Sequence, residues 1–545
     1  MAKRPAEEPL EEATTIASPS SKKARIEEEG LPPPPPAHSN GHSSKAQEMD
    51  VEDNESEDEG DRPATTRQDA PIEGYDSLYL DTIHRDRLDF DFEKLCSITL
   101  QNINVYACLV CGKYFAGRGP RTPAYLHALD VDHHVYINMG SKKVFVLPEG
   151  YEVKSRGLED IKFQVDPRLS VEEVRSLDRP SERQPSWDLN GRKYTPGYVG
   201  LNNIKANDYL NVVIQGLSHV HPLRNFFMLE DLSNSPQLLQ RLSVLVRKIW
   251  NPRAFKRHVS PHELMQEISL RSNKKFVLTD QADPVDFLNW FLNNVHLALG
   301  GSKTKSKSSI IQRIFQGRLR VESQKITARA DAGDRLKFED AATTIITTNF
   351  MILTLDLPPA PLFQDAVEAK NIIPQVPLTK VLEKYNGITG QEQRDTRVRY
   401  RLIHPLPPFL IMHVKRFQPN KFLDSQRNPT IVTFNPRSLD MSPYVEPDPA
   451  QYPPGDPIIY DLAANITHEG LKVRDDSVEG EAERKVWKAQ VREAGGGGGP
   501  GRDNWWEIQD LDVKEVNGEL LATKESYIMI WERRKVAASK GKATT

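Results

Sequence analysis

Four residues in one short stretch have the types and the spacing to hold a metal ion. Cys108 and Cys111 form a Cys-x2-Cys pair, fifteen residues separate this pair from His127, and His133 follows shortly after. Two thiolates and two imidazoles fill the four positions of a tetrahedral zinc ion and leave no position open for catalysis. In "CLVCG", Gly112 relieves the tight turn that lets both sulfurs face one ion. The pattern therefore predicts a structural zinc site.

The spacing leaves the last ligand open. It favours His133, but the neighbouring His134 could close the site through a shift of one residue. Cys96, the third cysteine of the chain, is either a small buried hydrophobic residue or a replacement ligand. Because all three cysteines fall within sixteen residues, a chance cluster of unrelated core thiols is disfavoured.

Length, charge and apolar content limit the class of protein. The chain has 545 residues, which suggests two or three folded units. The net charge of -4 is small for this length, so no overall basic excess calls for nucleic acid. The apolar runs are far shorter than the roughly 20 residues that span a bilayer, and the first residues lack the apolar core of a secretory signal. We expect a soluble intracellular protein with no membrane partner.

Residues 1–70 have the composition of a disordered tail. They contain a run of prolines and an acidic block, and they can bury too little apolar surface to offset the entropy lost on ordering. Basic clusters at Lys3–Arg4 and Lys22–Arg25 have the spacing of a bipartite nuclear import signal, although solvated charge is the simpler interpretation. We therefore expect a nuclear location. Residues 536–545 are expected to form a second disordered tail.

Two folded units are expected between these tails. Residues 72–176 carry regularly spaced aromatic and aliphatic residues around the predicted zinc site. A polar linker over residues 177–196 separates them from a larger unit over residues 197–535. Helical patterns dominate the first half of the larger unit and strand-like patterns the second half, which favours an α+β fold over alternating βαβ units.

The first unit resembles the ubiquitin-protease-type zinc finger, ZnF-UBP. The matching text is "YACLVCGKYFAGRG" followed by "AYLHALDVDHHVYINMGSKKVFVLPEGYEV". Fuller members of this family add further cysteine ligands that this chain lacks. The resemblance implies a structural Zn2+. In many members it also implies a grip on the free carboxyl terminus of ubiquitin through an arginine and aromatic residues, and Arg118 stands in the matching "GRG".

The second unit resembles the ubiquitin-specific protease (USP) family over essentially all of residues 197–535. "GLNNIKANDYLNVVIQ" from Gly200 is similar to the first box of that family. Five more boxes follow in order, "QADPVDFL", "FQGRL", "LPPFLIMHVKRF", "YDLAANITHEG" and "WWEIQDLDV". The resemblance implies a papain-like domain with thumb, palm and fingers. The whole chain is thus expected to be α+β, with a small ZnF-UBP zinc-binding domain followed by a papain-like USP domain.

The same resemblance locates the catalytic positions, and their residue types do not suit a cysteine protease. Asp208 replaces the nucleophilic cysteine, and the unit contains no cysteine at all. Val486 stands where the family has its basic histidine, and valine cannot accept a proton. Gln509, with Asp510 beside it, stands at the orienting position, whereas Asn203 matches the oxyanion-hole side chain. Because a carboxylate attacks amides poorly, we expect no catalysis.

Lost catalytic positions on a retained scaffold are typical of a pseudoenzyme, whose fold serves as a binding surface. The charged tail, the reduced finger and the cysteine-free USP unit resemble the splicing-associated, inactive members of the family. This implies a nuclear scaffold in pre-mRNA splicing that supports assembly or stability of the tri-snRNP, with spliceosomal tri-snRNP proteins as partners. The alternatives are a reader that binds ubiquitin or a ubiquitin-like protein, and a residual deubiquitinase. Direct RNA contact through the basic stretches from Arg247 and Ser302 is a further alternative.

Overall fold

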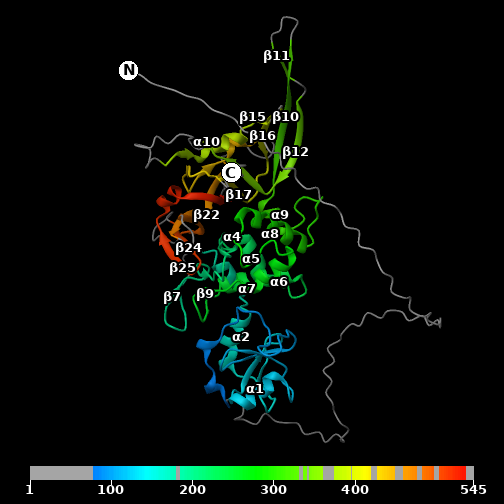
Figure 1. Ribbon diagram of the computed structural model, residues 1–545, viewed down its shortest axis with the longest axis vertical. Coiled ribbons are helices and arrows are strands. Elements are labelled where there is room, and N and C mark those ends of the chain that lie inside the picture. Colours follow the sequence, from blue (N-terminus) through cyan, green and yellow to red (C-terminus); the bar gives the residue numbers. More distant parts are fainter. Residues whose placement is uncertain are drawn as a thin grey trace, which may run out of the picture. The chain divides into compact units, whose positions relative to one another are not determined.

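The computed structural model (Figure 1) describes most of the chain between the two terminal segments. The tail over residues 1–70, with its two basic clusters, and the tail over residues 536–545 lie outside the described residues. The structure describes residues 78–179, 184–330, 336–340, 343–359, 373–393, 396–418, 426–448, 458–474, 481–495 and 503–534.

A small antiparallel sheet forms the centre of the finger, our name for residues 78–176. Its strand order is β2-β1-β3-β4-β5, and the strands are short and mostly buried because apolar residues such as Val135 and Ile137 point into a core shared with the helices. The elements are β1 (Val105–Cys108), β2 (Tyr114–Ala116), α1 (Pro123–Val131), β3 (Val135–Asn138), β4 (Val144–Val146), β5 (Glu152–Val153), α2 (Glu159–Val165) and α3 (Val171–Ser176).

Helices come first in the body, our name for the described residues from 197 to 534. Their starts follow local rules: Asp283 caps α8 by accepting a hydrogen bond from the Val285 N–H at 2.8 Å, and Ser309 caps α9. Every residue of α4 is buried, so this helix lies at the centre of the body. The helices are α4 (Asp208–Ser218), α5 (His221–Leu229), α6 (Gln237–Ile249), α7 (His262–Arg271), α8 (Pro284–Ala298), α9 (Ile310–Phe315) and the short α10 (Leu378–Leu382).

An eight-stranded sheet packs against α4. Its order is β13-β17-β26-β22-β23-β24-β25, with β21 paired to β22, and all its pairs are antiparallel except β13 with β17. Helix and sheet approach closely at Gly216, where an added methyl group would lie 3.4 Å from Ile530 of the sheet. The strands are β13 (Ile352–Asp356), β17 (Phe409–Lys415), β21 (Leu439–Asp440), β22 (Ile459–Arg474), β23 (Glu481–Glu493), β24 (Asn504–Gln509), β25 (Asp512–Val516) and β26 (Glu525–Arg533).

A second large sheet begins directly after α9. Its long strand β10 pairs with β11, β12 and β16. Its members are β10 (Gly317–Ala330), β11 (Leu336–Asp340), β12 (Thr344–Phe350), β15 (Gln391–Gln393) and β16 (Thr396–Ile403). Two-stranded pairs complete the fold: β6 (Ser186–Trp187) with β7 (Lys193–Tyr194), β8 (Gly200–Leu201) with β9 (His258–Val259), β14 (Gln375–Pro377) with β20 (Ile431–Thr433), and β18 (Phe417–Gln418) with β19 (Gln426–Arg427).

This order of elements confirms the expected α+β class. Helices α4 to α9 precede the strands of the large sheets, and the finger is a separate small sheet with its own core. The β6–β7 hairpin lies inside the segment 177–196 that we expect to act as a linker, so part of that segment has regular structure.

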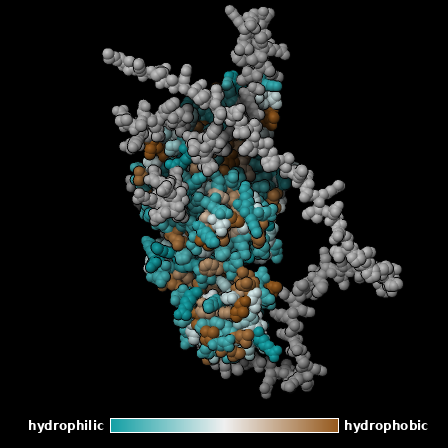
Figure 2. Space-filling view, in the orientation of Figure 1, coloured by the Kyte–Doolittle hydropathy of each residue, from teal (hydrophilic) through white to brown (hydrophobic). Residues whose placement is uncertain are grey.

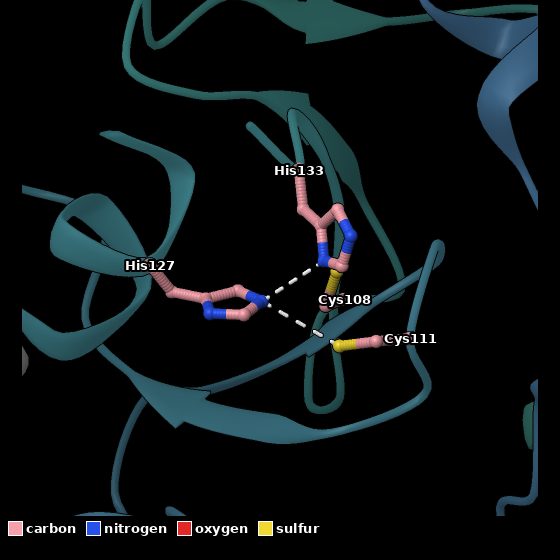
Figure 3. A group of neighbouring side chains, drawn as sticks. All are labelled: Cys108, Cys111, His127 and His133. Atoms are coloured by element: carbon pink, nitrogen blue, oxygen red, sulfur yellow. Dashed lines mark hydrogen bonds between the residues drawn. The ribbon is translucent and has the colours of Figure 1, made fainter. Parts of the chain in front are cut away.

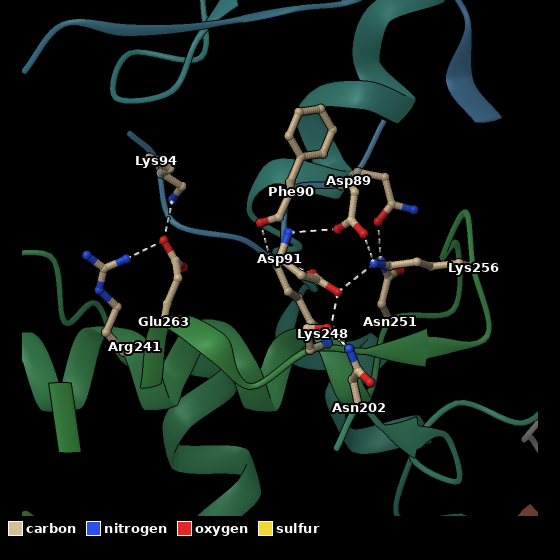
Figure 4. Close-up of polar contacts among 12 residues, drawn as sticks. Asp89, Phe90, Asp91, Lys94, Asn202, Arg241, Lys248, Asn251, Lys256 and Glu263 are labelled. Atoms are coloured by element: carbon tan, nitrogen blue, oxygen red, sulfur yellow. Dashed lines mark hydrogen bonds and ion pairs between the residues drawn. The ribbon is translucent and has the colours of Figure 1, made fainter. Parts of the chain in front are cut away.

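Finger and body contact each other through buried charges (Figure 4). The Asp91 carboxylate of the finger accepts hydrogen bonds from Lys248 Nζ at 2.9 Å and from the Ser260 N–H at 3.0 Å. Lys256 Nζ lies 2.9 Å from the same carboxylate, and nearby Lys94 of the finger pairs with Glu263 of the body at 3.9 Å. Buried ion pairs need such full sets of partners, because an unpaired charge away from water is costly.

The visible face of the molecule is mainly hydrophilic, with hydrophobic patches scattered between polar areas (Figure 2). Exposed apolar side chains include Leu126 and Leu129 of the finger, at 43% and 57% exposure. Among the described residues, no helix is both long enough and apolar enough to cross a membrane.

Candidate functional site

Local backbone geometry brings the four predicted metal ligands of the finger together (Figure 3). Cys108 ends β1, and the Gly112 N–H donates to the Cys108 carbonyl at 2.9 Å, which closes the turn that carries Cys111. Gly112 has a positive φ of 76°, and a side chain there would lie 2.4 Å from a backbone oxygen. His127 lies on α1, and His133 follows the left-handed residue that ends this helix.

The donor set fits a tetrahedral zinc ion. One ligand atom from each of Cys108, Cys111, His127 and His133 lies within 4.8 Å of all the others. His127 Nε2 is 3.1 Å from His133 Nδ1 and 3.5 Å from Cys111 Sγ. A tetrahedron with Zn–S and Zn–N bonds of about 2.3 and 2.0 Å places its ligands roughly 3.3–3.8 Å apart. The hydrogen bond between the two thiols lowers the pKa of Cys111 and raises the pKa of Cys108, so the pair shares one proton when no metal is bound.

The two alternative ligands lie outside this cluster. His134 Nδ1 is 2.7 Å from the Leu147 carbonyl and His134 Nε2 is 2.8 Å from Asp132, so both of its ring nitrogens are engaged. Cys96 is fully buried, and its sulfur accepts a hydrogen bond from the Thr99 N–H at 3.4 Å. This is the environment of a small core residue rather than of a ligand.

In the body, Asp208 is the first residue of α4 and its carboxylate is held from several sides. One oxygen accepts from the Tyr209 N–H at 2.9 Å and the other from Gln281 Nε2 at 2.6 Å. Burial raises the pKa of Asp208, and the negative charge of Asp510 adds to this effect. Both carboxylate oxygens of Asp208 therefore accept a hydrogen bond from a neighbouring residue.

Gln281 links α4 to the sheet. The same Nε2 that donates to Asp208 also donates to the Lys485 carbonyl of β23 at 3.0 Å. The backbone of Trp487, two residues further along β23, acts on the Asp208 carboxylate and favours a lower pKa. Val486 lies between these two contacts, is 7% exposed and sits opposite Glu469 of β22. The structure thus brings Asp208 beside the strand position of Val486, and valine offers no group that could take up a proton.

Two further predicted residues meet at the turn between β24 and β25. Asn203 Nδ2 donates to Asp510 Oδ2 at 3.2 Å, and Asn203 Oδ1 accepts from the Asn207 N–H at 3.1 Å. Gln509 is the last residue of β24 and pairs with Asp512 in the register of the turn. The turn lies so close to β8 that a methyl group on Gly200 would be 2.7 Å from the backbone of residue 511. The structure therefore gathers Asn203 and Asp510 around the start of α4.

Sequence reasoning missed the role of Gln281. This residue opens the "QADPVDFL" box, which the resemblance identified, but its contacts lie 73 and 204 residues away along the chain. The one sign in the sequence was that a polar residue, Gln281, stands at the head of a family box. No spacing rule links it to Asp208.

Comparison with known proteins matches both units. The family model described as ubiquitin carboxyl-terminal hydrolase matches residues 199–531, and the model described as Zn-finger in ubiquitin-hydrolases and other protein matches residues 95–158. The chain belongs to the ubiquitin carboxyl-terminal hydrolase family. Within this family it is 47% identical to "Probable mRNA-splicing protein ubp10" of Schizosaccharomyces pombe over 84% of this chain and 88% of that protein.

Other members of the ubiquitin carboxyl-terminal hydrolase family are similar over comparable lengths. Human "Ubiquitin carboxyl-terminal hydrolase 39" is 44% identical over 84% of this chain and 80% of that protein. A solved structure described as an essential yeast splicing factor covers 84% of this chain and 100% of its own, with a TM-score of 0.65 and 30% identity. The expected resemblance to splicing-associated members of the family is therefore confirmed.

Proposed function

We propose that this protein is a catalytically inactive USP-like scaffold that acts in pre-mRNA splicing in the nucleus and supports assembly or stability of the tri-snRNP. Spliceosomal tri-snRNP proteins are the partners that this proposal expects. The proposed inactivity is supported by the residues around Asp208, and the proposed splicing role is supported by the relatives.

The environment of Asp208 is the main support for the proposal that the protein is catalytically inactive. Its carboxylate is bound by Gln281 and by the backbone of Tyr209, and the nearby strand position holds Val486. Isopeptide hydrolysis by this family needs a thiolate and a base to activate it, and no cysteine occurs between residues 112 and 545. A buried carboxylate next to a valine supplies neither.

The splicing part rests on the names of relatives. The relative from Schizosaccharomyces pombe is named as a probable splicing protein, and the matching solved structure is described as a splicing factor. Both align with most of this chain, so the resemblance extends over finger and body together. A splicing role also agrees with the basic clusters at Lys3–Arg4 and Lys22–Arg25, which favour nuclear import.

Two experiments test the two parts. A fluorogenic ubiquitin substrate and an electrophilic ubiquitin probe should show no turnover and no covalent adduct with the full chain, and an adduct mapped to the body would overturn inactivity. Purification of the tagged chain from nuclear extract should recover tri-snRNP proteins together with U4, U5 and U6 RNA. Recovery of proteasomal or ribosomal partners in their place would overturn the splicing part.

We further propose that Cys108, Cys111, His127 and His133 hold a structural Zn2+. The family of the finger implies zinc, and the four donor atoms lie within 4.8 Å of one another. A bound ion would join β1 to α1 and the loop after it, so its contribution would be to the stability of the finger.

Binding of ubiquitin by the finger is a second candidate function. The Arg118 guanidinium lies 4.5 Å from the centre of the Phe145 ring, which forms an arginine–aromatic pair of the kind that this finger family uses for a peptide carboxylate. Titration of ubiquitin into the full chain and into Arg118→Ala tests this candidate. No binding at high micromolar ubiquitin would remove it.

A further inference from the structure

A cavity of ≈190 Å³ lies where the finger meets the body. The finger contributes Lys94, Lys142, Asp166 and Arg168 to its wall, and α6 of the body contributes Arg247 with polar neighbours such as Gln240 and Ser243. A water molecule occupies about 30 Å³ of liquid, so the cavity has room for several waters or for a small polyatomic ion.

The charged groups that line this cavity do not balance. Asp166 is the only carboxylate among the lining residues that the structure describes, and three cations share it. Lys142 Nζ lies at 2.6 Å and Arg168 Nε at 3.0 Å from one oxygen, and Arg247 Nη2 lies 2.7 Å from the other. Burial alone would raise the pKa of Asp166, but these cations outweigh it and hold the pKa well below its usual range.

The excess of positive charge persists when the next ion pairs are included. Lys94 pairs with Glu263, which also binds Arg241, and Arg168 pairs with Asp231 at 3.6 Å. The lining residues and these ion-pair partners together comprise five cations and three carboxylates, a formal excess of two positive charges. Asp231 has 73% of its side chain exposed, so its contribution is strongly screened by solvent.

Arg247 is the most deeply buried cation of the cavity wall. Its side chain is only 5% exposed, and its Nη1 donates to Ser243 Oγ at 2.9 Å. Its Nε, also buried, has no acceptor among the described residues. A buried guanidinium N–H without an acceptor costs free energy, and burial indeed lowers the pKa of Arg247.

We propose that this cavity binds a phosphate monoester and thereby clamps the finger onto the body. Arginine and lysine at short range bind tetrahedral oxyanions through charge-assisted hydrogen bonds. A monoester carries close to two negative charges at neutral pH, which matches the excess around the cavity, whereas a phosphodiester carries one. Because Lys94 and Lys142 belong to the finger and Arg247 to the body, one bound anion would contact both units.

Calorimetric titration of the full chain with inorganic phosphate, in a buffer of low ionic strength, tests the proposal. We expect one saturable site that Lys142→Gln or Arg168→Gln weakens by about tenfold, the effect of losing one charge-assisted hydrogen bond. Lys143→Gln is the matched control. It removes the same charge from the adjacent residue, which pairs with Glu152 and does not line the cavity.

Asp166→Asn gives a directional test, because it removes the carboxylate that competes with the ligand. This variant should bind phosphate more tightly than the unmodified chain. If Asp166→Asn does not fold, the phosphate affinities of Lys142→Gln and Lys143→Gln still test the proposal. Absence of a saturable site, or equal affinities of these two lysine variants, would overturn the proposal.

A second titration identifies the source of the phosphate. O-phosphoserine and a short phosphoserine peptide should compete with inorganic phosphate, and the matching unphosphorylated peptide should not. Competition by single-stranded RNA, in the absence of competition by O-phosphoserine, would overturn the assignment to a monoester and make the cavity a contact for a nucleic-acid backbone.

Discussion

Lys248 Nζ of α6 donates to Asp91 Oδ1 of the finger at 2.9 Å, and the two side chains are only 8% and 7% exposed. The two residues are 157 positions apart in the sequence. Lys256 Nζ forms an ion pair with the second carboxylate oxygen of Asp91, and Lys248 Nζ also donates a hydrogen bond to the Phe90 carbonyl (Figure 4). The cations outweigh the effect of burial and hold the pKa of Asp91 well below its usual range. Around Asp91, finger and body therefore meet through a buried pair whose charged groups both have partners.

Breaking this pair should destabilise the folded chain strongly. Asp91→Asn leaves Lys248 buried without its counter-ion, and removal of one partner from a buried pair costs about 3–5 kcal/mol. The free energy of unfolding, measured by urea denaturation, should fall by that amount. Asp160→Asn is the control: Asp160 pairs with Arg85 of the same finger, but both are exposed, at 43% and 34%. Such surface pairs contribute about 0–1 kcal/mol. An equal fall in the free energy of unfolding of both variants would contradict this prediction, because the buried Asp91–Lys248 pair would then contribute no more than a surface pair.

The adjacent histidines His133 and His134 should respond differently to the same substitution. His133→Gln removes a proposed zinc ligand, whereas His134→Gln removes a ring bonded to Leu147 and Asp132. After dialysis against a weak chelator, elemental analysis should find about one zinc ion per chain in the unmodified protein and in His134→Gln. His133→Gln should retain well below that amount. If His134→Gln lost its zinc and His133→Gln kept it, the fourth ligand would be His134 and not His133.

Asp208 should contribute to stability and not to hydrolysis. Asp208→Ala leaves Gln281 Nε2 and the Tyr209 N–H without their shared acceptor, a loss of about 1–3 kcal/mol in the free energy of unfolding. Asp280→Ala, which removes an exposed carboxylate nearby, should change stability little. Chemical denaturation and the fluorogenic ubiquitin assay together check this prediction. A turnover that is present in the unmodified chain and absent from Asp208→Ala would contradict it.

His413 should make the fold less stable in mild acid. Burial lowers the pKa of this β17 residue to about 4, and Lys415 acts in the same direction while Asp283 and Asp356 oppose it. In the unfolded chain the pKa is about 6.5, so between pH 6.5 and 4 the unfolded state binds a proton that the folded state does not. Stability should therefore fall as the pH falls through this window, by at most about 1.4 kcal/mol per pH unit.

His413→Phe removes this titration and retains a ring against Tyr527, whose ring centre lies 4.9 Å away. In thermal unfolding experiments, the melting temperature of the variant should fall less than that of the unmodified chain as the pH is lowered from 6.5 to 4. An unchanged slope would mean that His413 does not titrate as its burial implies.

Several features were readable from the sequence because they depend on neighbours along the chain. The "CLVCG" turn brings Cys108 and Cys111 together within four residues, and the helical and strand periodicities of the body follow from burial of one face of each element. Helical patterns followed by strand-like patterns predicted the α+β class, and the family boxes predicted the papain-like USP domain. Each box is a local pattern, and the order of boxes needs no knowledge of how they pack.

Other features depend on contacts that no local pattern encodes. Spacing favoured His133 but left His134 open, and only the structure shows that His133 joins the ligand cluster while His134 contacts Asp132 instead. Gln281 reaches both Asp208 and Lys485 only because α4 packs against β23.

By itself, the sequence determined which chemistry is present: zinc-type ligands in the finger, and no thiol in the body to attack an isopeptide bond. Residue types are properties of the chain and need no fold to be known. Only the tertiary structure decided which charges are buried together, such as Asp91 with Lys248 and Asp166 with Arg247. The free energy of a charge depends on its solvent exposure and on the partners within a few ångströms, and both are set by packing between distant segments.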